Sequence, residues 1–213
     1  MKKVILILLI IGVGCQSNQQ NKNNEGLKQV QPNKVFPKLE KNRYNVAFLI
    51  MDGTYNTELT APFDIFQHTI FRENIKAMNV FTVANTDKPI VTFEGMRILP
   101  DFNYLKDALP KIDILVVPSA EHHLDTDLED TAMLDFVKKV AKEAIFVTSH
   151  CDGAFVLAKA GLLDGKQATT WAGGEAELQR DFPAVKVQEN TNVVVDDGVI
   201  TSNGSLVSYQ AAL

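Results

Sequence analysis

The stretch FVTSHCDGAFVLAKAG, residues 146–161, changes pattern at a single cysteine. The apolar and β-branched residues before it (AIFVTS, 144–149) predict a buried strand. The residues after it (GAFVLAKAGLLDG, 153–165) predict a helix that ends in a turn. Cys151 therefore stands at a corner between a strand and a helix.

This corner has the layout of a nucleophile elbow, a sharp turn that exposes its central side chain above a sheet. Gly153 and Ala154 are small enough to relieve crowding after the cysteine. The free N–H groups and partial positive charge of a helix N-terminus favour a thiolate and could stabilise an oxyanion. The alternative is a small buried apolar residue, which is what most free cysteines are.

The flanking chain alternates predicted strands with predicted helices, which favours an α/β fold with a mostly parallel sheet. In such sheets, sites form beyond the carboxyl ends of the strands. The helix at 57–71 has Thr57 as its expected N-cap and an apolar stripe that ends at Ile70. The expected strands are 44–51, 78–85, 112–118 and 144–149, with a hairpin at 89–101 turning near Gly95 and helices at 57–71, 127–144 and 153–165. Residues 205–213 resemble the first turns of a helix, as in a truncated chain.

The N-terminal segment MKKVILILLIIGVGC has a basic start, an apolar run and small residues before Cys15. This is the layout of a signal peptide, and its ending resembles a bacterial lipoprotein signal, with a plain cleaved signal or an anchor as the alternative. Residues 16–43 are polar and predict a flexible tether. We therefore expect an exported protein, held at the membrane by lipid on Cys15, whose folded domain covers 44–213.

The domain is acidic. Residues 1–43 hold eight of the 21 Lys and Arg but two of the 26 Asp and Glu, so the other 170 residues carry 13 basic and 24 acidic side chains, a net charge of −11. Nucleic acid rewards basic surfaces, so we expect no nucleic-acid partner. The two cysteines lack zinc-site spacing, and no metal or cofactor is indicated.

The run VTSHCDGAFVLAKAGLLDGKQATTW, residues 147–171, resembles the ThiJ/PfpI family of the class I glutamine amidotransferase-like superfamily. The resemblance extends over most of the domain and implies a flavodoxin-like three-layer sandwich, often assembled as a homodimer. It implies that Cys151 is the nucleophile and that Glu58, in the motif TELTAP, is the carboxylate beside it. The alternative for Glu58 is an acid favoured by the helix dipole.

Four further residues stand at positions that matter in the family, and three of them, Ser119, Ala120 and Trp171, depart from its pattern. The loop PSAEHH has Ser119 and Ala120 where relatives carry two glycines that supply backbone N–H groups; the Asp152 N–H would complete that set. The Asp152 side chain is expected to cap the helix, although some relatives contact substrate there. Trp171, a pocket wall or a core residue, replaces a histidine that many relatives place near the cysteine.

Three other histidines are candidates for the missing base or for substrate contact. His122 and His123 lie in the loop after the strand 112–118, and His150 precedes the cysteine. A solvated or structural histidine is the alternative for each.

The resemblance implies a cysteine-dependent hydrolase, hydratase or lyase acting on a small electrophilic molecule, in the manner of isonitrile hydratases or of deglycases and glyoxalases. The alternative is a non-catalytic binding or thiol redox-sensing module, and a peptidase is a weaker alternative because peptidase relatives rely on the absent histidine.

Overall fold

The computed structural model describes residues 34–213. The predicted signal segment with Cys15, and residues 16–33 of the predicted tether, lie outside the described residues. Within the described part of the chain, no helix is both long enough and apolar enough to cross a membrane.

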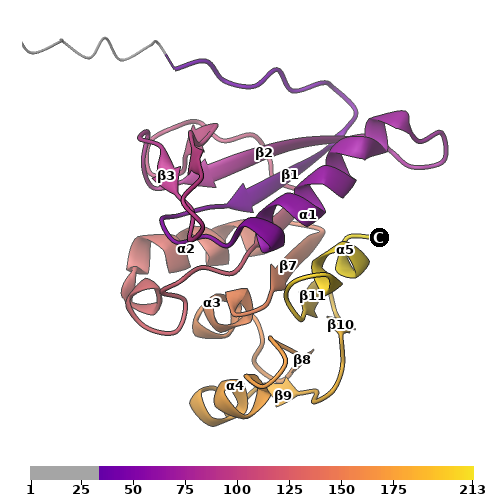
Figure 1. Cartoon of the computed structure of the whole chain (residues 1–213). Coiled ribbons are helices and arrows are strands. Elements are labelled where there is room, and N and C mark those ends of the chain that lie inside the picture. Colours follow the sequence, from indigo (N-terminus) through magenta and orange to yellow (C-terminus); the bar gives the residue numbers. More distant parts are fainter. Residues whose placement is uncertain (1–33) are drawn as a thin grey trace, which may run out of the picture. The chain divides into compact units, whose positions relative to one another are not determined.

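One seven-stranded sheet forms the centre of the domain, in the order β10-β11-β7-β6-β1-β2-β5 (Figure 1). Neighbouring strands are parallel except for the antiparallel pair β10 and β11. The strands are β1 (Tyr44–Leu49), β2 (Met78–Ala84), β5 (Phe102–Asn103), β6 (Ile114–Val117), β7 (Phe146–His150), β10 (Val193–Asp196) and β11 (Val199–Ser202). The predicted α/β fold with a mostly parallel sheet is confirmed.

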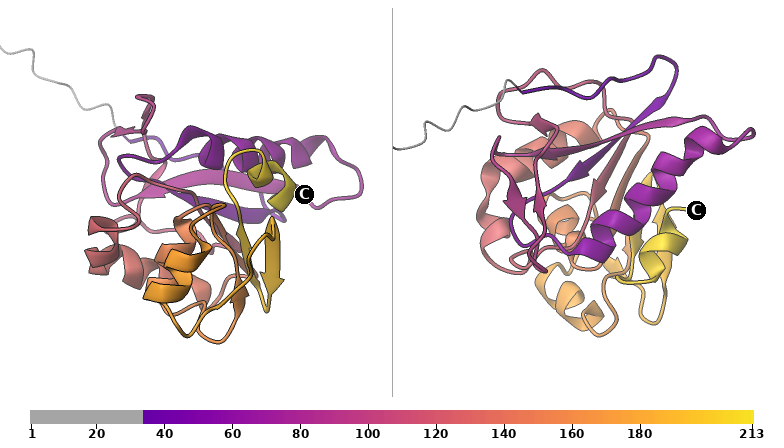
Figure 2. Two further views of the ribbon diagram at one scale, coloured as in Figure 1. Left: turned by 60° about the horizontal axis from the view of Figure 1, so that its bottom comes forward. Right: turned by 45° about the horizontal axis from the view of Figure 1, so that its top comes forward.

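Helices cover both faces of this sheet, as the two views of Figure 2 show. Because side chains alternate along a strand, β1 serves two cores. Val46 and Phe48 pack in the same cluster as Leu59 of α1, whereas Ala47 and Leu49 pack with apolar residues of α2 and α3. The helical segments are α1 (Asn56–Gln67), η1 (His68–Phe71), η2 (Thr126–Glu129), α2 (Thr131–Ala141), α3 (Gly153–Lys159), α4 (Glu175–Asp181) and α5 (Val207–Ala211). This arrangement is the flavodoxin-like three-layer sandwich.

Two small ribbons complete the domain. The expected hairpin forms between β3 (Ile90–Val91) and β4 (Arg97–Ile98), and Gly95 in its turn has a φ of +91°, which favours glycine. The second ribbon pairs β8 (Gln167–Ala168) with β9 (Lys186–Val187) in parallel.

Several helix boundaries differ from the sequence prediction. The helix α1 begins at Asn56 with Tyr55 as its N-cap, so Thr57 is not the cap. The apolar stripe ends early because the chain tightens into a 3₁₀ turn after Gln67, and Ile70 is left 45% exposed. The predicted helix 127–144 divides into η2 and α2, because the Asp130 carboxylate accepts a hydrogen bond from the Met133 N–H at 3.0 Å and caps α2.

The predicted tether is also shortened at its C-terminal end. The Phe36 ring stacks on Phe102 with centroids 5.2 Å apart. The backbone N–H and carbonyl of Glu40 both pair with the Asn79 side chain, each at 3.0 Å. An aromatic ring and a satisfied buried amide thus hold residues 35–43 against the sheet edge near β2 and β5.

Candidate functional site

Cys151 occupies the turn between β7 and α3 with a φ of +54°, a backbone conformation that non-glycine residues seldom adopt. Its N–H donates to the Ser202 carbonyl at 2.9 Å, and its carbonyl accepts from the Thr170 hydroxyl at 2.8 Å. These bonds from two other segments hold the turn. Gly153 is needed here, since a Cβ on it would lie 2.3 Å from the Val117 carbonyl oxygen. The geometry is that of the predicted nucleophile elbow.

Glu58 lies beside the sulfur. It is 6% exposed on the first turn of α1, and its Oε1 accepts a hydrogen bond from the Ser205 N–H at 2.6 Å. A Cβ on Gly204 would lie 2.6 Å from Glu58 Oε1 and 3.2 Å from Cys151 Sγ. The carboxylate and the sulfur therefore face the same point, and they come so close to residue 204 that only glycine fits there.

Gly204 and Ser205 are site residues that the sequence analysis missed. The sequence did contain a signal for Gly204. It lies two residues after the strand pattern VITS, at the carboxyl end of that strand, where parallel sheets place their sites.

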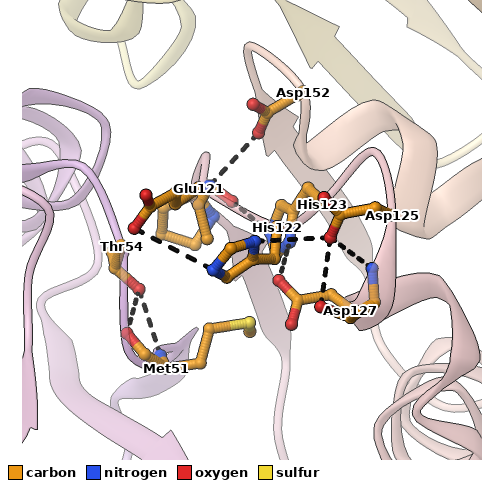
Figure 3. A network of polar contacts seen from close by, with 11 residues as sticks. Met51, Thr54, Glu121, His122, His123, Asp125, Asp127 and Asp152 are labelled. Carbon is orange, nitrogen blue, oxygen red and sulfur yellow. Dashed lines mark hydrogen bonds and ion pairs between the residues drawn. The ribbon is translucent and has the colours of Figure 1, made fainter.

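The loop after β6 supplies the third part of the site. An isolated antiparallel bridge joins Ala120 to Thr54 and fixes this loop. The Ser119 hydroxyl lies near the Cys151 thiol and the Asp152 carboxyl group and acts to lower the pKa of both groups. The Ala120 N–H donates to Asp152 Oδ1 at 3.2 Å (Figure 3). We call the following six residues the cysteine site: Glu58, Ser119, Ala120, Cys151, Asp152 and Gly204.

The prediction that the Asp152 side chain caps α3 is wrong. Asp152 stands at the N-cap position, yet its side chain makes no capping hydrogen bond. It turns instead toward the β6 loop, where its Oδ1 accepts a hydrogen bond from the Ala120 N–H. The Ala120 N–H, expected to await an oxyanion, is thereby occupied by a carboxylate.

The prediction of a thiolate favoured by the helix N-terminus is also wrong. Burial, followed by the negative charge of Asp152, raises the pKa of Cys151 to about 12. Hydrogen bonds from Ser119 and the Asp152 N–H oppose this shift, and the charge of Glu58 adds to it. Burial and the two acids thus outweigh the groups that favour the ionised sulfur.

Burial also raises the pKa of the Asp152 carboxyl group, and the charge of Glu58 acts in the same direction. His123, Ser119 and the Ala120 N–H oppose the shift. The charges of Asp152 and Glu58 thus both act against ionisation of the Cys151 thiol.

The candidate histidines take structural positions. His123 is fully buried between the Asp127 carboxylate, 2.9 Å from Nδ1, and the Pro118 carbonyl, 3.0 Å from Nε2. His122 is half exposed and pairs with Asp125 at 3.3 Å (Figure 3).

His150 is buried with its Nδ1 2.8 Å from the Ser202 hydroxyl, and burial lowers its pKa to about 4. Among the hydrogen bonds of residues 34–213, none joins a histidine to Cys151. His123 acts only at a distance, through its effect on Asp152.

Two aromatic residues complete the surroundings. Trp171 stacks on Phe155 of α3 with centroids 5.3 Å apart and fills the space beside Gly174, so it packs against the core. Tyr55, which the sequence analysis missed, stacks on Phe93 of the β3–β4 hairpin with centroids 4.6 Å apart. The Tyr55 N–H donates to the Ser119 carbonyl at 2.9 Å, which places Tyr55 beside the cysteine site, and burial and the charges of Asp152 and Cys151 raise the pKa of its phenol.

No group of three or more His, Cys, Asp or Glu side chains within residues 34–213 is arranged to hold a metal ion.

Comparison with known proteins agrees with this geometry. The chain is 30% identical to the isonitrile hydratase of Pseudomonas putida over 169 residues, which cover 79% of this chain and 68% of that protein. It is 27% identical to the protein dj-1beta of Drosophila melanogaster over 134 residues, 62% of this chain and 70% of that protein.

Solved structures give the same fold. A ThiJ/PfpI family protein from Pseudomonas syringae aligns with a TM-score of 0.69 at 22% identity, over 85% of this chain and 74% of that one. Drosophila melanogaster DJ-1beta aligns with a TM-score of 0.67 at 19% identity, over 80% of this chain and 87% of that one. The DJ-1/PfpI family description matches residues 44–212, almost the whole domain, and the chain therefore belongs to the DJ-1/PfpI family.

Proposed function

We propose that this protein hydrates a small, uncharged electrophile of the isonitrile type, with Cys151 as nucleophile and Glu58 as the group that takes and returns the proton. One observation carries the proposal: Cys151 Sγ and Glu58 Oε1 both lie within 3.2 Å of the point that a Cβ on residue 204 would occupy. The similarity to an isonitrile hydratase supports the choice of substrate class.

The proton path follows from the raised thiol pKa. Because Cys151 is held as a thiol, its proton has to leave as the sulfur attacks, and Glu58 is the acceptor that faces it. The sulfur would bond to the terminal carbon of the isonitrile while the thiol proton passes through Glu58 to that carbon. The product of this step is a thioimidate, R–N=CH–S–Cys151.

Water then completes the reaction. It adds to the thioimidate carbon, the C–S bond breaks, and the sulfur recovers a proton, which releases the formamide R–NH–CHO. The Asp152 N–H and the Ser119 hydroxyl both favour the ionised form of the sulfur and would stabilise it as it leaves. Trp171 occupies the position of the family histidine, so the proton transfers fall to the carboxylate.

A redox-sensing role is less well supported. Oxidation of a sensor cysteine requires thiolate character, whereas burial and Asp152 raise the pKa of Cys151 to about 12.

The test uses the full chain in detergent with cyclohexyl isocyanide, and formation of N-cyclohexylformamide is followed by chromatography. Cys151→Ala should abolish turnover, and Glu58→Gln should lower it by about 10²- to 10⁴-fold. Glu143→Gln, at an exposed position beyond α2, is the matched control and should leave turnover unchanged. If wild type forms no formamide, or if Glu58→Gln retains full activity, the proposal is wrong.

The N-terminal expectations remain proposals of their own. We propose that lipid on Cys15 holds the protein at the outer side of a membrane, and that the domain forms a homodimer as the family resemblance implies. Cys15→Ala should release the protein into the soluble fraction, and analytical ultracentrifugation of that variant should give twice the chain mass. Continued membrane association of the variant, or a monomer, would contradict the respective proposal.

A further inference from the structure

Asp152 holds the position where an anion would otherwise be stabilised. In cysteine-dependent catalysis, backbone N–H groups beside the nucleophile receive the negative charge that develops on the substrate. Here the Ala120 N–H already donates to Asp152 Oδ1 at 3.2 Å. A carboxylate built into the chain thus stands where an anionic substrate group would bind.

The charges around the sulfur have one sign. Among the described residues, the two charged groups that act on the Cys151 thiol are Asp152 and Glu58, both acids. Besides burial, the negative charges of Asp152, Glu121 and Glu94 likewise raise the pKa of Tyr55.

The nearby histidines are already paired with acids. His123 contacts Asp127, and His122 contacts Asp125 and lies 4.0 Å from Glu121 (Figure 3). Neither offers an unpaired positive charge to a substrate anion. The stacked rings of Tyr55 and Phe93 lie near the acids that act on Tyr55. Aromatic faces attract cations, so the rings and the acids favour the same sign of charge.

We propose that Asp152 sets the charge selectivity of the cysteine site: it admits neutral or cationic electrophiles that bring a hydrogen-bond donor, and it excludes anionic ones. A donor such as an N–H or ammonium group can replace the Ala120 N–H as the partner of the carboxylate. An anion finds that position filled and meets two carboxylates, while the positive group that acts on Asp152, His123, is already paired with Asp127. This inference rests on the proposed function only in taking Cys151 as the reacting group.

The test measures charge selectivity directly, without turnover. The full chain carrying Cys15→Ser, which leaves Cys151 as its single cysteine, is treated with methanethiosulfonate reagents bearing a trimethylammonium or a sulfonate group. The rates are measured by mass spectrometry, and their ratio is divided by the same ratio for glutathione. We expect this relative preference for the cationic reagent to exceed about 10-fold.

Asp152→Asn keeps the shape of the side chain and removes its charge. The relative preference for the cationic reagent should therefore fall most of the way to the value of 1 that glutathione defines. The ratio cancels any general change in thiol reactivity, because both reagents attack the same sulfur. Asp135→Asn, an exposed acid on α2, is the matched control and should leave the ratio unchanged. The proposal is overturned if wild type shows no preference relative to glutathione, or if Asp152→Asn retains it. If Asp152→Asn does not fold, the wild-type ratio decides alone.

The two proposals fail separately. A strong Asp152-dependent preference without formamide production would refute the hydratase and leave the charge selectivity standing. Formamide production without the preference would do the reverse.

Discussion

The substitution Gly204→Ala tests the central geometry of the site. The new methyl group would lie 2.6 Å from Glu58 Oε1 and 2.9 Å from Cys151 Cβ, both shorter than carbon contacts allow. The φ of Gly204 lies outside the left-handed region, so alanine can adopt the backbone and the effect is steric. The Cys151 backbone is fixed by its bonds to Ser202 and Thr170, so the Glu58 side chain has to move.

The expected loss of stability follows from the hydrogen bond that the substitution breaks. Movement of Glu58 breaks its hydrogen bond to the Ser205 N–H, now 2.6 Å long, and hydrogen bonds to charged groups contribute about 1.5–3 kcal/mol. We expect the free energy of unfolding to fall by about that amount in urea denaturation at neutral pH. Isonitrile turnover, if present, should fall by about 100-fold or more, because the carboxylate no longer faces the sulfur.

A double-mutant cycle isolates the cause. In a Glu58→Ala background the carboxylate is absent and only the close contact with Cys151 remains, so Gly204→Ala should cost less than it does with Glu58 present. Gly95→Ala, in the open hairpin turn, is the control for loss of a glycine away from the site; its cost should be the same in both backgrounds. If Gly204→Ala costs as much without Glu58 as with it, Glu58 does not occupy this position and the reasoning fails.

Two further predictions concern stability. Burial lowers the pKa of His150 from 6.5 to about 4, so the folded protein binds this proton less readily than the unfolded chain; stability should be full above pH 6.5 and decline by on the order of 3 kcal/mol as the pH falls to 4. Urea denaturation of His150→Gln should show a flatter pH dependence, and an unchanged one would contradict the assignment. Asp130→Ala removes the cap of α2 and should cost about 1 kcal/mol in the same assay. The exposed Asp135→Ala on that helix should change stability by less than about 0.5 kcal/mol, and equal costs for the two variants would refute the capping role.

Local sequence patterns were sufficient to predict the architecture and the position of the cysteine. Strand and helix periodicities are local, so residues 44–51 and 144–165 predicted β1, β7 and α3 without knowledge of their neighbours. The small residue at position 153 and the cysteine before it likewise predicted the elbow. Helix ends were less certain because caps depend on one side chain, as with Asp130, or on a tight final turn, as after Gln67.

The surroundings of the sulfur, in contrast, follow from the packing of distant segments and could not be predicted from local patterns. The parallel order β11-β7-β6-β1 brings four carboxyl ends to one edge, so that loops far apart in sequence meet there: Gly204, Cys151, Ala120 and Glu58. Whether Asp152 caps its own helix or crosses to the β6 loop depends on where that loop offers an N–H group. The pKa of the thiol depends on burial by all these segments together, because desolvation and the charges of acids from other elements act through space.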